Sequence, residues 1–158
     1  MSEKPKGGKF KYRLETVLKV RGIRERREQE EFAKKQREYL TEKEKEEEID
    51  REKKTKTGEL RHILKKGPIS DFERVMRRRH HLGVVKEQLD KQVEEVRKAQ
   101  ELLEGQREKL IEAMKKRKII EKNKEHKFEE YKGVMKKLEE NFLDEIATVR
   151  HEHLKRQD

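Results

Sequence analysis

Apolar side chains recur every seven residues along much of this chain, and the pattern is strongest in its second half. One heptad position there is occupied by Val75, Leu82, Leu89, Val96, Leu103 and Leu110, and later by Tyr131 and Leu138. A second position is occupied by Phe72, Val93, Met114, Phe128, Met135, Phe142 and Val149. Two apolar positions in each heptad predict a long helix with a left-handed coiled-coil seam.

The first half of the chain carries a thinner version of the same pattern. Its two heptad positions hold Leu18, Phe32, Tyr39 and Leu60, and Leu14, Ile49 and Ile63. Between Thr41 and Gly58, Ile49 is the sole large apolar residue. A helix with so little apolar surface is marginal by itself. We therefore expect this segment to stay helical only against a partner helix.

Gly and Pro mark the division between the two halves. Gly67 suits the left-handed position after a helix, and Pro68 cannot continue one. Ser70 and Glu73 have the spacing of a capping box, which begins a helix. We predict a flexible basic arm at residues 1–9, a first helix at 10–64, a hairpin turn at 65–69 and a second helix at 70–156.

A short connection between two seamed helices favours an antiparallel pair. The predicted fold class is all-α: an elongated two-helix antiparallel coiled-coil hairpin with the second helix longer than the first. Folding the chain about Gly67 places Leu60 level with Val75 and Tyr39 level with Val96. Apolar residues meet apolar residues in this register.

The second helix has two further features. Its seam weakens at residues 115–127, where Ile119 and Ile120 fall off the seam positions, so we expect a register shift, a bend or a mobile joint. Beyond that point the helix outruns its partner and carries an apolar stripe. An apolar stripe of this size is expected to contact another protein, a second copy or the N-terminal arm; it comprises Phe128, Tyr131, Met135, Leu138, Phe142, Ile146 and Val149.

Composition narrows the function classes. The chain has 158 residues, of which 51% are charged and 29% hydrophobic, and it has no cysteine. It therefore lacks a disulfide framework and thiolate metal sites. No phosphate-binding loop, nucleophile motif or paired His spacing for a metal is present. We expect no enzyme activity, no catalytic residue, no cofactor and no metal.

The net charge of +10 is distributed in bands that make both ends of the predicted hairpin basic and its middle acidic. Segments of like charge face each other in the predicted hairpin, so the pairing of the helices must depend on the apolar seam. The basic ends suit acidic surfaces on partner proteins. Runs such as 76–81 and 115–118 could bind phosphates, although we do not expect nucleic acid as the partner. No segment is apolar enough for a membrane span, which predicts a cytoplasmic protein.

Two short motifs resemble the flagellar export protein FliJ family. Residues 10–21, FKYRLETVLKVR, resemble the start of that family's first helix. Residues 137–139 and 143–147 followed by Arg150 resemble its C-terminal region. The resemblance implies a soluble, non-enzymatic part of the flagellar type III protein export apparatus that serves motility. It would be a coiled coil similar to the central stalk of rotary ATPases, cytoplasmic and peripheral to the inner membrane.

The resemblance also implies partners and binding residues. The partners would be the export ATPase hexamer, the cytoplasmic side of the membrane export gate, and export chaperones. The end with both chain termini would enter the ATPase ring through Arg13, Leu14, Leu18, Arg21, Leu143, Ile146 and Arg150. The hairpin tip would contact the gate through Phe72, Val75, Met76 and Arg79, of which Phe72 and Val75 also fit the seam.

Three alternatives remain at this point. The chain could be the equivalent stalk of a virulence injectisome, which the sequence separates poorly from a flagellar one. It could be a self-assembling structural coiled coil. It could also be a nucleic-acid binder whose affinity falls steeply with salt.

Overall fold

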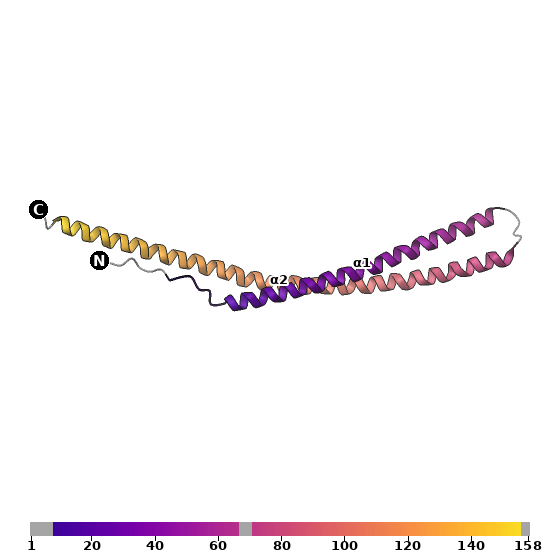
Figure 1. Cartoon of the computed structure of the whole chain (residues 1–158), viewed down its shortest axis with the longest axis horizontal. Coiled ribbons are helices and arrows are strands. Elements are labelled where there is room, and N and C mark those ends of the chain that lie inside the picture. The colour runs from indigo at the N-terminus through magenta and orange to yellow at the C-terminus, as the bar shows by residue number, and fades with distance from the viewer. Residues whose placement is uncertain (1–7, 67–70, 156–158) are drawn as a thin grey trace. The chain divides into compact units, whose positions relative to one another are not determined.

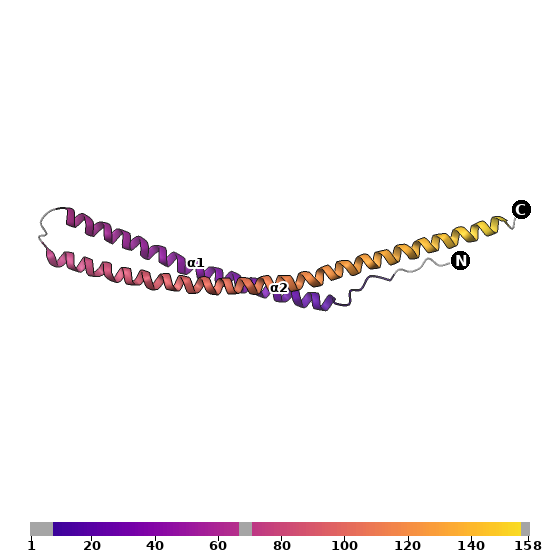
Figure 2. The same cartoon turned by 180° about the vertical axis from the view of Figure 1, so that it is seen from behind.

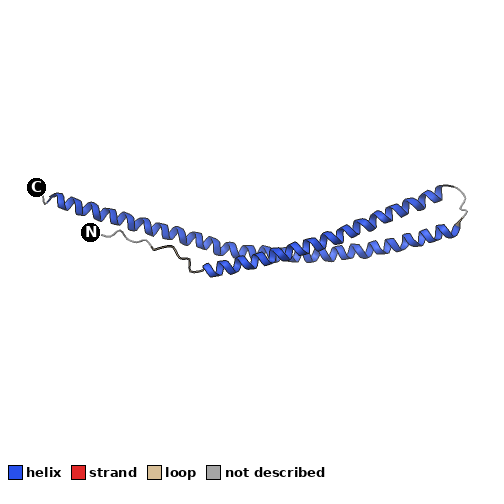
Figure 3. Cartoon of the chain, viewed as in Figure 1, coloured by secondary structure: helices blue, strands red, loops and turns tan. Residues whose placement is uncertain are grey.

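The computed structural model describes residues 8–66 and 71–155 and contains two helices. Helix α1 is Glu15–Lys65, with 51 residues, and helix α2 is Phe72–Lys155, with 84 residues (Figure 1). The described residues form no strand (Figure 3). The predicted fold class, all-α with a longer second helix, is confirmed.

Both helix starts differ from the sequence expectation. Helix α1 begins at Glu15, where the Glu15 amide donates to the Tyr12 carbonyl at 3.2 Å, rather than at residue 10. Asp71 precedes α2, and its Oδ1 accepts from the Arg74 amide at 2.9 Å. This is the hydrogen bond of a helix N-cap. The predicted cap, Ser70, and most of the predicted turn lie outside the described residues.

The chain divides into two compact units, each containing one part of both helices. The tip unit is residues 26–112, and the terminal unit combines residues 8–25 with residues 113–155. In the tip unit, α1 and α2 lie side by side and run in opposite directions (Figure 2). Each unit is thus an antiparallel pairing of segments from the two halves of the sequence.

Two matching contacts define the register of the tip unit. Gln92 Nε2 donates to the Glu42 carbonyl at 2.9 Å and to Glu42 Oε2 at 2.7 Å. Gln106 Nε2 makes the same two contacts with Glu28, at 3.4 and 2.5 Å. The residue numbers sum to 134 in both pairs (42 plus 92, and 28 plus 106), so the register is constant over this length. It agrees closely with the register expected from folding about Gly67.

The core of the tip unit comes from α2. Its buried apolar residues are Val75, Leu82, Val85 and Val96. The facing positions of α1 are mostly polar and half-buried, and include Glu28, Lys35, Glu42, Glu46, Lys53 and Lys56. Long side chains at such positions cover apolar surface with their methylene stems while the charged heads reach water. The polar segment around Ile49 is therefore held against an apolar face of α2, as expected.

The second predicted seam position of α2 is wrong in this unit. Phe72 is 66% exposed and Val93 is 47% exposed, whereas Val85, three residues after Leu82, is only 1% exposed. The partner helix lies on the side of residues 78, 85, 92, 99 and 106, not 72, 79, 86, 93, 100 and 107. If the side of residues 72, 79, 86 and 93 packed against α1, Arg79 and Lys86 would lose their hydration. Burial of an unpaired charge is costly.

On the side of α2 that packs against α1, the polar residues have hydrogen-bond or ion-pair partners on α1. Arg78 forms an ion pair with Glu59 at 2.9 Å, and the two glutamines hydrogen-bond to glutamates. Charge therefore contributes contacts between the helices even though like-charged bands face each other. Further out, His81 Nε2 lies 3.3 Å from Glu52.

In the terminal unit, α2 continues as an unbroken helix through residues 115–127. The charged seam positions of this stretch are paired: Arg117 with Glu25 and Glu121, and Lys124 with Glu15 at 2.7 Å. Ile120, expected off the seam, is half-buried and its carbonyl lies 3.1 Å from the Tyr12 hydroxyl, while Ile119 is exposed. The weak stretch of the apolar seam is therefore bridged by ion pairs.

Candidate partner-binding surfaces

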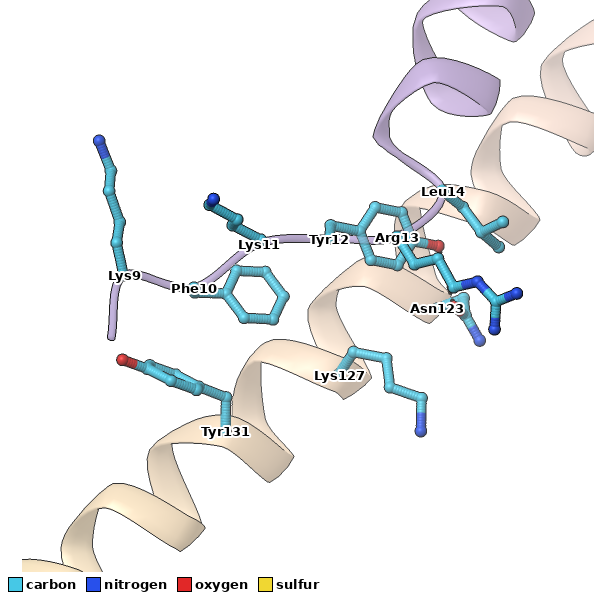
Figure 4. Close-up of a pocket in the computed structure, with 9 residues that line it drawn as sticks. All are labelled: Lys9, Phe10, Lys11, Tyr12, Arg13, Leu14, Asn123, Lys127 and Tyr131. Atoms are coloured by element: carbon cyan, nitrogen blue, oxygen red, sulfur yellow. Dashed lines mark hydrogen bonds between the residues drawn. The ribbon is translucent and has the colours of Figure 1, made fainter. Parts of the chain in front are cut away.

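Residues 8–14, here called the strap, precede α1 and lie along α2 without forming a helix. The Tyr12 hydroxyl lies within hydrogen-bond distance of Asn123 Oδ1 at 2.9 Å and of the Ile120 carbonyl at 3.1 Å (Figure 4). At the other end of the strap, the Tyr131 hydroxyl donates to the Gly8 carbonyl. Contacts at both ends thus hold the strap against α2.

Aromatic rings join the strap to the apolar stripe of α2. The Phe10 ring centroid lies 5.2 Å from that of Phe128 and 5.5 Å from that of Tyr131. These separations are in the range of favourable aromatic pairs. Lys132 Nζ lies 4.6 Å from the Phe128 centroid, within the range of a cation–π contact. The start of the apolar stripe therefore contacts the chain's own N-terminal segment through Phe10, a residue expected in the first helix and not in the arm at residues 1–9, and Phe128 stays 40% exposed.

A pocket lies between the strap and α2. It is lined by Lys9, Phe10, Lys11, Tyr12, Arg13, Leu14, Asn123, Lys127 and Tyr131 (Figure 4). Four of these nine residues are basic and none is acidic. The Phe10 ring lies between the strap and α2, and Tyr131 faces it from the helix. The pocket therefore combines aromatic walls with a positive rim.

On α1, well beyond the strap, the buried carboxylate of Glu25 accepts a hydrogen bond from Arg117 Nε. This hydrogen bond, with the charges of Glu25 and Glu121, raises the pKa of Arg117, so its guanidinium stays charged. An Arg that donates to two carboxylates from two helices fixes their relative positions. The contact orients the start of α1 on α2.

The residues predicted to meet the ATPase ring fall into two groups in the terminal unit. Arg13 and Leu14 line the pocket, and Leu18 and Arg21 lie half-buried on α1 beside α2. Leu143 lies 19 residues beyond Lys124, the residue that pairs with Glu15. At the rise of an α-helix this is about 28 Å farther along. The structure therefore does not bring Leu143, Ile146 and Arg150 together with the first group.

The later part of the apolar stripe is open to contact. Leu143 is 58% exposed, Leu138 and Val149 are also exposed, and Ile146 is half-buried. The described part of the strap ends at Gly8, level with Tyr131, so it does not extend over these residues. Helix α2 thus presents an apolar face over its last described turns.

Three of the four residues predicted at the hairpin tip share an exposed face of α2. Phe72, Met76 and Arg79 are exposed and have the spacing of one helix face, whereas Val75 is buried in the tip unit. Val75 is therefore a core residue, as weighed from the sequence. Phe72 is not, and its ring is free for contact.

The sequence reasoning missed the pairing of Phe10 with Phe128 and Tyr131. A signal for it was present, because Phe10 and Tyr12 are two residues apart and follow Gly7 and Gly8. Side chains two residues apart lie on the same side of an extended segment and not of a helix. The spacing thus favoured an extended strap over an early helix start.

Within residues 8–66 and 71–155, no group of His, Asp or Glu side chains is arranged to hold a metal ion. None of the described helical segments is long and apolar enough to cross a membrane. The chemistry of the described residues lies in exposed helix faces and in the pocket under the strap.

The fold and these surfaces define an antiparallel coiled-coil protein whose candidate functional residues lie on exposed helix faces. The sequence model of the flagellar FliJ protein family matches residues 10–156, and the chain belongs to that family. A solved structure described as a candidate YscO homologue, CT670 of Chlamydia trachomatis, is 28% identical. The alignment covers 94% of this chain and 99% of that one, with a TM-score of 0.46. No curated protein in the comparison matches the chain significantly.

Family membership confirms the resemblance noted in the sequence. It assigns the chain to the flagellar type III protein export apparatus, of which the FliJ family is a non-enzymatic component. The partners of the chain are accordingly parts of that apparatus in general.

Proposed function

We propose that this protein acts as a central-stalk-like coiled coil that docks into the ring of the export ATPase through its terminal unit. The observation that carries the proposal is the exposed apolar face of α2 around Leu143 and Ile146 in a member of the FliJ family. Exposed contiguous apolar surface is a mark of protein–protein contact. Arg150, on the same part of α2, adds a cation at the edge of this face.

Arg13, Leu14, Leu18 and Arg21 form the second part of the proposed ring contact. Glu15, between Leu14 and Leu18, pairs with Lys124, which lies about 28 Å before Leu143 along α2. A ring contact that uses both groups therefore engages two levels of the terminal unit. Leu18 and Arg21 also pack against α2, so a substitution there affects folding together with docking.

Leu143 offers the cleaner test, because its side chain is 58% exposed and Leu102, in the tip unit, is exposed to the same extent. The measurement is stimulation of the cognate export ATPase by purified wild-type and variant chains. Leu143→Glu is expected to reduce stimulation, and Leu102→Glu is expected to leave it unchanged. Full stimulation by Leu143→Glu, or an equal loss with both variants, would remove Leu143 from the proposed contact.

At the hairpin tip, the proposed partner is the cytoplasmic side of the export gate. Phe72, Met76 and Arg79 support this proposal because they place an aromatic ring, a flexible thioether and a cation on one exposed face. Methionine and aromatic side chains are enriched in contact surfaces. Val75 drops out of the proposed contact set, since its side chain is buried in the tip unit.

The gate contact is tested by binding of the isolated cytoplasmic domain of the gate protein to immobilised chain. Phe72→Ala is expected to weaken binding, because it removes an exposed ring without disturbing the core. Leu64→Ala is the matched control, since Leu64 is an exposed apolar residue near the end of α1 in the same unit. Equal binding by both variants and wild type would exclude Phe72 from the gate contact.

Export chaperones are the third proposed class of partner, and family membership is what supports this proposal. The flagellar assignment is preferred to the injectisome counterpart because the matching family is the flagellar one. Co-purification with the flagellar export ATPase would support this preference, and selective co-purification with an injectisome ATPase would reverse it.

A further inference from the structure

We infer that the pocket between the strap and α2 is a binding site for a short acidic peptide segment that carries an apolar side chain. The chemistry of the lining leads to this partner class. Phe10, Tyr12 and Tyr131 supply apolar walls, while Lys9, Lys11, Arg13 and Lys127 supply positive charge at the rim. No carboxylate is among the lining residues.

The charge on the rim is available for a ligand. Lys127 pairs with Glu130 at 2.7 Å, but within the described part of the chain Lys9, Lys11 and Arg13 make no ion pair. All three are exposed. Lys124, nearby on α2, is paired with Glu15, so the neighbouring carboxylate is already neutralised. The rim therefore has unpaired positive charge that attracts an anionic partner, most strongly at low ionic strength.

The walls argue for a peptide over a simple polyanion. The Phe10 and Tyr131 ring centroids lie 5.5 Å apart, so the two rings pack on each other and form one continuous apolar wall. An aromatic wall of this kind favours an apolar side chain packed against it, because burial of that side chain adds to the electrostatic attraction. A polyanion without such a side chain would use the rim alone. Peptide binding that depends on both charge and one apolar residue is therefore the signature of this site.

The site extends beyond the proposed ring contact. Lys9 and Lys11 do not belong to the residues proposed to meet the ATPase ring, although Arg13 and Leu14 are shared by the two surfaces. A chain altered only at Lys9 and Lys11 thus separates peptide binding from ATPase stimulation. Loss of peptide binding with normal stimulation would leave the ring proposal intact.

The probe is a fluorescent peptide of alternating Glu and Gly with one central Phe, and binding is followed by fluorescence anisotropy at low and physiological salt. The test variant is Lys9→Glu with Lys11→Glu. The matched control is Lys118→Glu with Lys122→Glu, which makes the same charge change at exposed positions of α2 outside the pocket. Circular dichroism confirms that both variants keep the helical content of the wild type.

The test variant is expected to bind the peptide about fivefold or more weakly than wild type, and the control to bind within about twofold of it. Replacing the peptide's Phe by Ser is expected to cause a loss of similar size. Equal losses in both variants, equal binding of the Ser peptide, or no binding to wild type would overturn the inference. Tighter binding of a single-stranded oligonucleotide of the same charge would also overturn it in favour of nucleic acid.

Discussion

Truncation of Val85 tests which face of α2 packs on α1. Val85 is 1% exposed and Val93 is 47% exposed, and both lie in α2 within the tip unit. The heptad pattern of the sequence assigned Val93 to the seam, whereas the structure exposes Val93 and buries Val85, which folding about Gly67 places level with Ile49. Val85→Ala and Val93→Ala make the same chemical change in the same helix. Their difference in stability therefore reports the difference in burial.

The magnitude follows from the area that each valine removes from water. At about 0.8 kcal/mol per buried methylene-sized group, the two carbons lost from Val85 cost about 1.6 kcal/mol, and those lost from the half-exposed Val93 cost about half as much. Alanine is the better helix former by about 0.5 kcal/mol, and this gain is common to both variants. Val85→Ala additionally leaves a cavity at a close-packed position. We expect Val85→Ala to be less stable than Val93→Ala by about 1 kcal/mol.

The assay is urea unfolding followed by the helical circular dichroism signal. With a slope of about 2 kcal/mol per molar urea, a difference of about 1 kcal/mol separates the two midpoints by about 0.5 M. The slopes of the two variants should agree, because both unfold the same structure. A midpoint for Val93→Ala equal to or below that of Val85→Ala would refute the assigned seam and restore the face that includes Phe72 and Val93.

Two further predictions concern the ends and the surface of the helices. Asp71→Ala is expected to lower stability by about 1 kcal/mol because it removes the acceptor for the Arg74 amide, whereas Asp71→Ser should retain most of it; equal unfolding midpoints for the two variants would contradict the capping role. Acid is also expected to destabilise the chain, because hydrogen bonds from lysines lower the pKa of several glutamates below the ordinary 4.5, namely Glu31, Glu42, Glu87 and Glu130. The stabilisation that these ionised glutamates give the folded chain is present above their ordinary pKa and is lost as the pH falls through the lowered pKa values. The thermal unfolding midpoint should therefore decrease below about pH 4.5. An unchanged midpoint in acid would exclude this stabilisation.

The part of the fold that follows from the sequence is the part in which the heptad repeat agrees with the helix-ending Gly and Pro residues. Val75, Leu82 and Val96 were placed on the seam by their spacing, and they are buried. The end of α1 followed from Gly67 and Pro68, and α1 ends at Lys65. A heptad repeat with one strong position predicts the helix and its apolar edge, because these depend on residues close together in the chain.

The second seam position required information that one helix does not contain. Residues three before and three after a seam residue lie on either side of it, and both sides of α2 carry apolar residues. The choice depends on which polar residues find partners on α1, as Gln92 does on Glu42. Phe72 was assigned to the seam for the same reason and is instead exposed at the tip. Because the sequence did not show which side of α2 packs on α1, it predicted neither the full core of the tip unit nor the exposed face of Phe72, Met76 and Arg79.

The distribution of buried residues separates the roles of the two units. All the buried apolar residues of the described chain lie between Val75 and Val96, in the tip unit. The terminal unit has half-buried apolar residues such as Leu18 and Met114, together with the ion pairs of Glu25 and Lys124 and the aromatic contacts of Phe10. Segments with few buried apolar contacts open at lower free energy than close-packed ones. The small number of buried apolar residues in the terminal unit therefore predicts that this unit opens at a lower free energy than the tip unit.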